Sequence, residues 1–348
     1  MHDARRNPRI LAMTLAASAA SATLGSGATW SADFAAPVLD RWMYPFNATP
    51  GARTAASTFG SEPGATDFDS RDGQMLVAFA TGSQLPTGRG DEITVTRAVL
   101  EVEVATNLAF IYDPTPDAWQ TFLAADDPDR IEDLDAGQPV ECFGVGFRNG
   151  WSAASFQESS PYTAAGTSFL APGVRNAFAA TMDAAGTVTD VSQNPRQRFG
   201  PAAWATGTIE DVAPGEFVPA GRVMRFELAV DDPGVQRYLR EGIDAGRLFL
   251  SVSSLTFVEQ QAGQFPSFVT KENALVPLGL ARAPRLVVEA REGSPCIAAD
   301  LDCDGAVNGI DLGVMLGNWG PCAGCAADLN GDGDVNGIDL GVLLGNWG

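Results

Sequence analysis

Residues 299–320 read ADLDCDGAVNGIDLGVMLGNWG, and residues 327–348 read ADLNGDGDVNGIDLGVLLGNWG. The two copies begin 28 residues apart and agree at 18 of 22 positions. The four differences are Asp302/Asn330, Cys303/Gly331, Ala306/Asp334 and Met315/Leu343. A repeat this close indicates one structural unit that is used twice, so both copies are expected to fold alike.

Oxygen-bearing residues recur in each copy at positions 1, 3, 5, 9 and 12 of a loop that begins at its first aspartate, with glycine at position 6. Loops with this spacing surround Ca²⁺ with about six to eight oxygens, position 7 contributing its backbone carbonyl. The expected ligands of the first loop are Asp300, Asp302, Asp304, Ala306, Asn308 and Asp311. Those of the second loop are Asp328, Asn330, Asp332, Asp334, Asn336 and Asp339. The sequence therefore predicts two bound Ca²⁺ ions.

The charge balance of residues 296–348 agrees with metal binding. This segment contains eight Asp and no Glu, Lys, Arg or His, and seven of the eight Asp stand at ligand positions. Without a cation, the carboxylates gathered in each loop would repel one another. The alternative, an acidic flexible tail, does not account for a repeated ligand spacing.

Only the exit side of each loop is expected to be helical, over 310–319 and 338–347, because the entry sides are short and contain Pro. A duplicated unit of loop and exit helix, with the pattern D-x-[DN]-x-D-G-x-V-N-x-x-D, resembles the type I dockerin module of secreted bacterial proteins. The resemblance implies calcium-dependent folding over 292–348. It also implies docking onto a cohesin-like protein or another extracellular scaffold.

Each exit helix carries two glycines four residues apart. A bare glycine face permits close approach of another helix. We expect the two repeats to pack on each other there, because short repeats bury themselves on a neighbour. The alternative is a face that docks a partner. The candidate docking residues are Ile310, Gly313, Gly317, Ile338, Gly341 and Gly345.

Residues 1–22 have the features of a secretory signal peptide. Arg5, Arg6 and Arg9 precede a short apolar stretch, and residues 20–22 offer a small-residue cleavage site. The stretch is too short for a membrane span, and no other segment is apolar enough to be one. We therefore expect a bacterial protein that is exported and lies outside the cell or at its surface.

Export permits disulfides, and four of the five cysteines lie in the repeat region. They are Cys296, Cys303, Cys322 and Cys325. Two bridges are the main expectation, and the sequence leaves their pairing open. A zinc site is the alternative, although only Cys322 and Cys325 have the usual spacing. Cys142 is expected to be a small buried apolar residue.

The chain has a formal net charge of −21, which opposes contact with nucleic acids and anionic membranes. Its only histidine is His2, inside the expected signal peptide. Catalysis by Ser-His-Asp, Cys-His or His-ligated zinc is therefore excluded for the exported chain. These observations favour a protein that is not an enzyme.

Residues 23–291 are expected to form an antiparallel β-sandwich, so that the fold as a whole is mainly β with a small helical module. Alternating apolar residues predict strands at 100–104, 224–230 and 248–252, and further strands are expected at 74–80 and 285–290. One short helix is expected at 233–241. Residues 109–215 match no pattern and are expected to be a long insertion.

The ends of this body resemble the DNRLRE-type carbohydrate-binding jelly rolls. The matching segments are GQMLVAFATGSQLPTG (73–88), TVTRAVLEVEV (94–104), FVTKEN (268–273) and APRLVVEA (283–290). The resemblance implies a non-catalytic domain that binds polysaccharide or packs in an extracellular assembly.

Binding of a sugar requires exposed aromatic rings. The candidates are Trp42, Tyr44, Trp119, Trp151 and Trp204, although each is expected to be core more often than platform.

Paired carboxylates would be needed for a glycan-active enzyme, the least favoured reading. Glu101 and Glu103 are expected on a solvated sheet face. The acidic run of Asp126, Asp127, Asp129, Glu132, Asp133 and Asp135 is expected to be a solvated loop, with a further calcium site as the alternative.

The sequence thus predicts a secreted, non-catalytic protein that docks through two calcium loops. Polysaccharide binding by the body is the second hypothesis.

Overall fold

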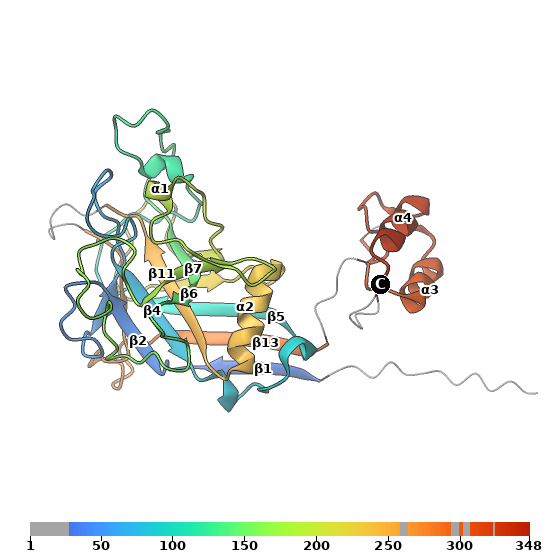
Figure 1. Cartoon of the computed structure of the whole chain (residues 1–348), viewed down its shortest axis with the longest axis horizontal. Coiled ribbons are helices and arrows are strands. Elements are labelled where there is room, and N and C mark those ends of the chain that lie inside the picture. Colours follow the sequence, from blue (N-terminus) through green and yellow to red (C-terminus); the bar gives the residue numbers. More distant parts are fainter. Residues whose placement is uncertain (1–27, 258–263, 294–298, 302–306, 323) are drawn as a thin grey trace, which may run out of the picture.

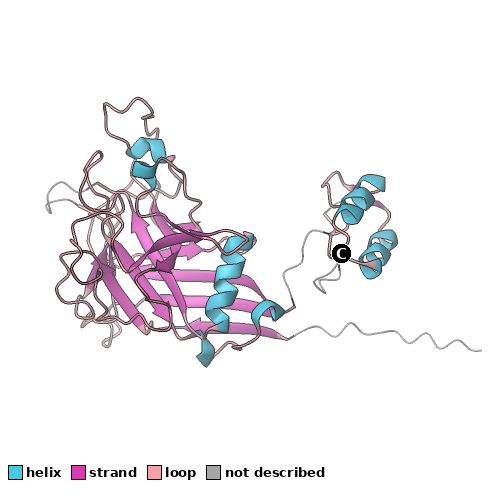
Figure 2. Ribbon diagram, in the orientation of Figure 1, coloured by secondary structure: helices cyan, strands magenta, loops and turns pink. Residues whose placement is uncertain are grey.

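The computed structural model describes residues 28–257, 264–293, 299–301, 307–322 and 324–348. Up to residue 293 the chain forms two antiparallel sheets whose inner faces share one hydrophobic core (Figures 1 and 2). The prediction of a mainly β protein with a β-sandwich body is confirmed. The predicted signal peptide lies outside the described residues.

The smaller sheet has four strands in the order β1-β13-β5-β10. They are β1 (Thr29–Phe34), β13 (Arg285–Glu292), β5 (Ile93–Glu103) and β10 (Val223–Glu227). In β13 alternate residues are buried, as expected for a strand with one face on the core. On the opposite face Arg285 pairs with Asp33 at 2.6 Å and with Glu101 at 3.0 Å. The sequence periodicity of β13 therefore reflects this one-sided burial, whereas most of β5 is buried on both faces.

The larger sheet has the order β2-β4-β11-β6-β7-β8, with β9 paired beside β6. Its strands are β2 (Leu39–Met43), β4 (Gln74–Phe79), β11 (Leu248–Ser254), β6 (Val140–Phe147), β7 (Ala177–Met182), β8 (Val188–Asp190) and β9 (Ala205–Thr206). One face packs on the shared core, and the other forms a second cluster with Phe156 and Trp151. Both faces are thus covered, and every residue of β4 and β11 is buried.

The segment 109–215 is not an insertion beside the sandwich, because it supplies β6 to β9 of the larger sheet. In particular, β6 pairs with β11 on one side and with β7 and β9 on the other. Nearly all of β6 is buried, so its sequence VECFGVGF shows no alternation. A strand that is buried on both faces lacks the period-two pattern that sequence reasoning uses.

Helix α2 (Pro233–Asp244) packs against the sandwich, as the sequence predicted, and ends three residues later than expected (Figure 1). Asp232 caps it by accepting hydrogen bonds from the N–H groups of Gly234 and Val235, at 2.8 and 3.1 Å. Its buried face joins the core through Val235, Leu239 and Ile243. Short elements complete the body: β3 (Ala55–Ser57), β12 (Ser267–Val269), α1 (Asn194–Gln197) and the 3₁₀ turns η1 (Thr81–Ser83), η2 (Gly90–Glu92) and η3 (Trp119–Phe122).

The C-terminal repeat folds around α3 (Gly309–Gly317) and α4 (Gly337–Gly345), with a small ladder of β14 (Gly320–Pro321) and β15 (Asp334–Val335). Both helices lie where the sequence placed them. Their shared core consists of matched pairs from the two copies: Ala299 and Ala327, Val307 and Val335, Met315 and Leu343. The repeat therefore generates a core in which each copy contributes equivalent residues.

Candidate functional sites

The second calcium loop is organised by its first and last aspartates. Asp328 accepts the N–H groups of Gly331 at 2.9 Å, Asp332 at 3.1 Å and Gly333 at 2.8 Å. Asp339 accepts those of Leu329, Asn330 and Asn336 at 2.8, 3.1 and 2.8 Å. These backbone donors, that of Asn336 foremost, hold the pKa of Asp339 below its ordinary value. Both aspartates thus bend the chain into the loop.

Asn330, Asp332, Asp334 and Asn336 occupy the remaining positions of this loop. Asp332 accepts from Asn330 Nδ2 at 2.8 Å and from Asp334 N at 3.0 Å. Asp334 is exposed, and its carbonyl accepts a bond from Asn336 Nδ2 at 3.1 Å. Asn336 also caps α4, its Oδ1 accepting from Ile338 N at 2.8 Å. The exposed carboxylate of Asp334 agrees with a contribution from the backbone rather than the side chain at position 7.

The first loop is described only at its two ends, since residues 302–306 lie outside the described part of the chain. Its last aspartate, Asp311, is buried and accepts from Leu301 N at 2.6 Å and Asn308 N at 2.7 Å. Asn308 caps α3 by accepting from Ile310 N at 2.8 Å. The described ends therefore repeat the arrangement of the second loop. The expected ligands Asp302, Asp304 and Ala306 lie in the segment outside the described residues.

The donors of the second loop suit Ca²⁺ because all of them are oxygens. Asp339 offers about four lone-pair sites and uses three of them on the backbone, so one remains for a cation. The second loop has three carboxylates, Asp328, Asp332 and Asp339. Their oxygens are not all within 4.8 Å of one another, unlike those of two acidic trios among the described residues of the body. A bound cation would have to draw them together.

The glycine faces of the two helices do not pack on each other, contrary to our expectation. A methyl group built on Gly313, Gly317, Gly341 or Gly345 would meet no atom within 4 Å outside its own helix and chain neighbours. The helices instead contact the shared core through Met315 and Leu343. The glycines are therefore left as an open surface of the module.

Large apolar side chains stand exposed in matched pairs on both copies. The exposed fractions are 58% and 60% for Ile310 and Ile338, 53% for each of Leu316 and Leu344, and 50% and 48% for Trp319 and Trp347. These values agree within a few per cent between copies. The module therefore presents the same apolar surface twice.

The cysteines of the repeat region form at least one bridge. Cys322 and Cys325 are joined by a disulfide in the chain between the two copies. The bridge excludes these two residues as free thiolate ligands of zinc. Cys296 and Cys303 lie outside the described residues. Cys142 is a free thiol and fully buried, as the sequence predicted.

The body contains a cavity of about 790 Å³ with aromatic walls. Trp42 and Tyr44 stack with their ring centres 4.5 Å apart, and Arg53 lies 5.6 Å from the Trp42 ring. Further rings line the cavity: Phe46, Phe59, Phe68 and Phe265. Aromatic walls beside polar groups are typical of a ligand cleft.

Polar groups of the cavity include Glu62, Asp67 and Asp72. Burial raises the pKa of Asp72 to about 7, with the Arg175 guanidinium opposing and Asp69 adding to the rise. Burial, and then the nearby Asp72, raises the pKa of Tyr44 to about 12. The cleft therefore combines stacking surfaces with a carboxyl group that changes charge near neutral pH.

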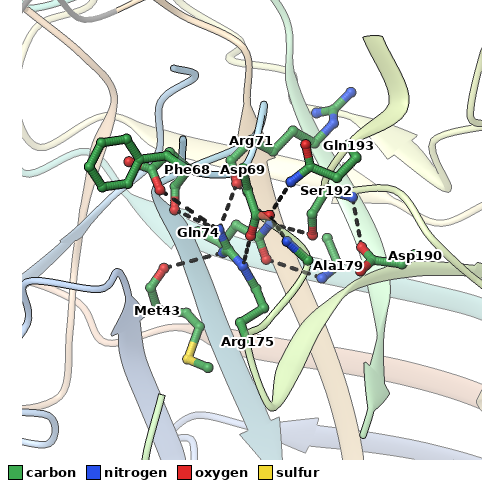
Figure 3. A network of polar contacts seen from close by, with 12 residues as sticks. Met43, Phe68, Asp69, Arg71, Gln74, Arg175, Ala179, Asp190, Ser192 and Gln193 are labelled. Atoms are coloured by element: carbon green, nitrogen blue, oxygen red, sulfur yellow. Dashed lines mark hydrogen bonds and ion pairs between the residues drawn. The ribbon is translucent and has the colours of Figure 1, made fainter. Parts of the chain in front are cut away.

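A buried polar network supports the chain segment that lines this cavity (Figure 3). Arg175 is fully buried and pairs with Asp69, which also accepts from Gln193 Nε2 and from Gly173 N. Arg175 further donates to the carbonyl of Asp72 at 3.0 Å. Because these bonds satisfy the buried charges, they hold residues 68–72 in one conformation.

Of the aromatic candidates from the sequence, only Trp42 and Tyr44 line the cleft. Trp204 is core, and its ring packs so closely on Gly144 that a methyl group there would lie 2.2 Å from it. Trp151 packs on the second cluster, and Trp119 lies in η3. The sequence analysis overlooked Phe46, Phe59 and Phe265. The alternation of aromatic residues at 42, 44 and 46 was an available signal for part of this group.

The paired carboxylates of β5 belong to structural ion pairs and hydrogen bonds. Glu101 contacts Arg225 at 2.8 Å and Arg285 at 3.0 Å, on the outer face of the smaller sheet. Glu103 is buried and accepts from Arg282 N at 2.9 Å. In the acidic run, Asp127 and Asp129 each lie 2.6 Å from Arg198.

No helix in the described part of the chain is both long enough and apolar enough to cross a membrane. A scan against protein-family models finds no match for the chain, and a search of curated proteins finds none either.

Proposed function

We propose that this is a secreted, non-catalytic protein whose C-terminal module binds two Ca²⁺ ions and docks the body onto a cohesin-like partner outside the cell. The observation that carries the proposal is the duplicated apolar surface. Ile310 and Ile338 are more than half exposed in the same place on each copy, beside glycines that no other described part of the module covers. Such matched surfaces suit a partner that can bind in either of two orientations.

Calcium has a defined part in this proposal. Each helix has one internal glycine, Gly313 or Gly341, and an internal glycine costs about 1 kcal/mol of helix propensity relative to alanine. Loop residues Asn308 and Asn336 cap the helices, so the loop and the helix start form one unit. A cation that orders the loop would thereby order the start of the docking helix.

The test measures binding of the full chain to a panel of cohesin domains, with calcium and with a chelator. Ile310→Asp and Ile338→Asp should each leave most of the affinity, while the double variant should lose it. Leu278→Asp is the matched control, since Leu278 is 69% exposed on the body. Absence of calcium-dependent binding to any cohesin, or loss of binding in one single variant, would refute the two-orientation proposal.

A second candidate function is polysaccharide binding, which the aromatic cleft favours. The stacked pair of Trp42 and Tyr44 forms a ring surface at a cavity of about 790 Å³, which is large enough for a sugar unit. Arg53 and Asp67 supply polar groups at its rim. Stacking on the apolar face of a pyranose, with hydrogen bonds from such groups, would hold a glycan there.

Glycan-array binding of the full chain tests this second function. Tyr44→Ala should abolish a positive signal, and Trp119→Ala, which changes an aromatic residue outside the cleft, should leave it intact. Equal loss in both variants would show that the cleft is not the site. Hydrolysis of a bound glycan would instead favour a carboxylate-based enzyme.

A further inference from the structure

Two loops of the body that are distant in sequence bring their aspartates together. The first loop, 113–117, follows a bridge between Ile111 and Phe217, and the second, 133–138, leads into β6. Carboxylate oxygens of Asp113, Asp117 and Asp135 lie within 4.8 Å of one another. A methyl group added to Gly137 would lie 3.0 Å from the Asp113 side chain, so the two loops are in contact.

The buried member of this trio has an oxygen without a hydrogen-bond donor. Asp113 is 5% exposed, and its Oδ2 has no partner, as is also true of the buried Oδ2 of Asp117. Thr115 Oγ1 lies 2.6 Å from Asp113 Oδ1 and 2.7 Å from Asp135 Oδ2, but a hydroxyl has one proton for the two carboxylates. A buried carboxylate oxygen left unsatisfied is costly.

Basic groups do not neutralise this trio. Among the described residues, no Lys or Arg forms an ion pair with Asp113, Asp117 or Asp135. A fourth carboxylate, Asp133, is close enough to add its charge to that felt by Asp117. The cluster therefore has a charge that the protein itself does not balance.

We propose that Asp113, Asp117 and Asp135 form a calcium site in the body, separate from the two loops of the C-terminal module. The donors are carboxylate oxygens only, which excludes the softer metals that prefer sulfur or imidazole. They come from two irregular loops rather than from a rigid element, and such flexible oxygen sites suit Ca²⁺ better than Mg²⁺, which demands octahedral geometry. The cation would connect Asp113 to Asp135. It would thereby hold the loop 133–138, which leads into β6, against the loop 113–117.

The test counts calcium ions bound to the full chain by equilibrium dialysis. In a background of Asp300→Ala and Asp328→Ala, which disables both module loops, about one calcium should remain bound per chain. Adding Asp117→Asn and Asp135→Asn should remove it. If the background binds no calcium, or the added changes leave binding intact, the site does not exist. A tenfold excess of Mg²⁺ should not displace the ion, and displacement would overturn the calcium assignment.

Stability measurements separate loss of the site from loss of the fold. Without calcium, the Asp117→Asn, Asp135→Asn variant should unfold at the same temperature as its parent or higher, because like charges are removed. With calcium, only the parent should gain in unfolding temperature. Asp127→Asn with Asp129→Asn is the matched control, since it removes two charges from the same acidic run and should keep the calcium response. A control that loses the response, or a test variant that is less stable without calcium, would contradict the proposal.

Discussion

The described residues of the body include two carboxylate trios of similar compactness, and they differ in what balances their charge. Asp40, Glu158 and Glu272 surround the Lys271 ammonium, which lies 2.9 Å from Asp40 and 2.7 Å from Glu272. Lys271 is the only lysine of the chain. Within the described ranges, no Lys or Arg side chain pairs with the trio of Asp113, Asp117 and Asp135. The presence of one side chain thus separates a structural ion cluster from a candidate metal site.

The second of the two predicted calcium loops shows a third way of placing carboxylates. Asp328 and Asp339 each accept three backbone N–H groups, which are partial positive charges fixed by the chain itself. Backbone donors orient an aspartate without cancelling its charge. Negative charge therefore remains for a cation in the second loop and in the second trio, whereas in the first trio the Lys271 ammonium offsets one of the three carboxylates.

Replacing Lys271 should give a large loss of stability, because it would leave the first trio, like the second, without a side-chain cation among the described residues. Burial alone would lower the pKa of Lys271, but its bonds to Glu158, Glu272 and Asp40 raise it above the ordinary lysine value. Lys271→Met leaves these carboxylates unpaired. We expect a loss of about 2–3 kcal/mol in the free energy of unfolding, less than for a fully buried pair.

Denaturant unfolding measures this loss. Arg237→Met is the control, because Arg237 and Glu241 form an exposed pair that should contribute less than about 1 kcal/mol. Equal losses in both variants would show that Lys271 has no special part in compensating the trio, and the contrast between the two trios would fail.

Asp72 is an intermediate case. Its Oδ1 lies 3.9 Å from Nη2 of Arg175, and the same guanidinium already forms an ion pair with Asp69. The pKa of Asp72 is raised to about 7 in the folded protein, so the folded state binds more protons than the unfolded state above pH 4. Stability should therefore fall as pH rises from about 4 to about 7, by up to about 1.4 kcal/mol per pH unit.

Asp72→Asn should remove this part of the pH dependence when unfolding is followed at several pH values. Asp67→Asn changes an exposed carboxylate of the same cavity and should preserve it. A pH profile of the Asp72→Asn variant that matches the parent would show that Arg175 compensates both aspartates.

The smallest effects should come from the calcium loops, where position decides the outcome. Asp328→Ala removes a predicted ligand and three backbone bonds, so calcium affinity of the second loop should fall at least about tenfold, which is about 1.4 kcal/mol. Asp334→Ala removes only an exposed carboxylate and should change the affinity less than about twofold. Calorimetric titration distinguishes them, and equal losses would refute the loop register.

The predictable parts of the fold are those with one-sided burial or local bonding. Strand β13 alternates in sequence because it alternates in burial. The start of α2 was visible because Asp232 and Pro233 are a cap and a first-turn residue next to each other. The sequence did not predict strand β6 of the segment 109–215, because both faces of β6 are covered. Such a strand has no alternation of apolar and polar residues.

The packing of the two exit helices was predicted incorrectly for a related reason. Glycines four residues apart indicate a possible helix contact, but sequence does not reveal which face meets the core. Met315 and Leu343 occupy the core and turn the glycines outward. Ile310 and Ile338 are exposed together with these glycines.

The sequence by itself determined the expected calcium ligands and the two exit helices, because a calcium loop and its helix are complete within about twenty residues. It could not determine the aromatic cleft or the trio around Asp113. Those sites join Trp42 to Phe265 and Asp113 to Asp135, and only the packing of the two sheets places them together. Burial then decides their chemistry, since a carboxylate that water would solvate on an exposed loop loses that solvation inside the fold.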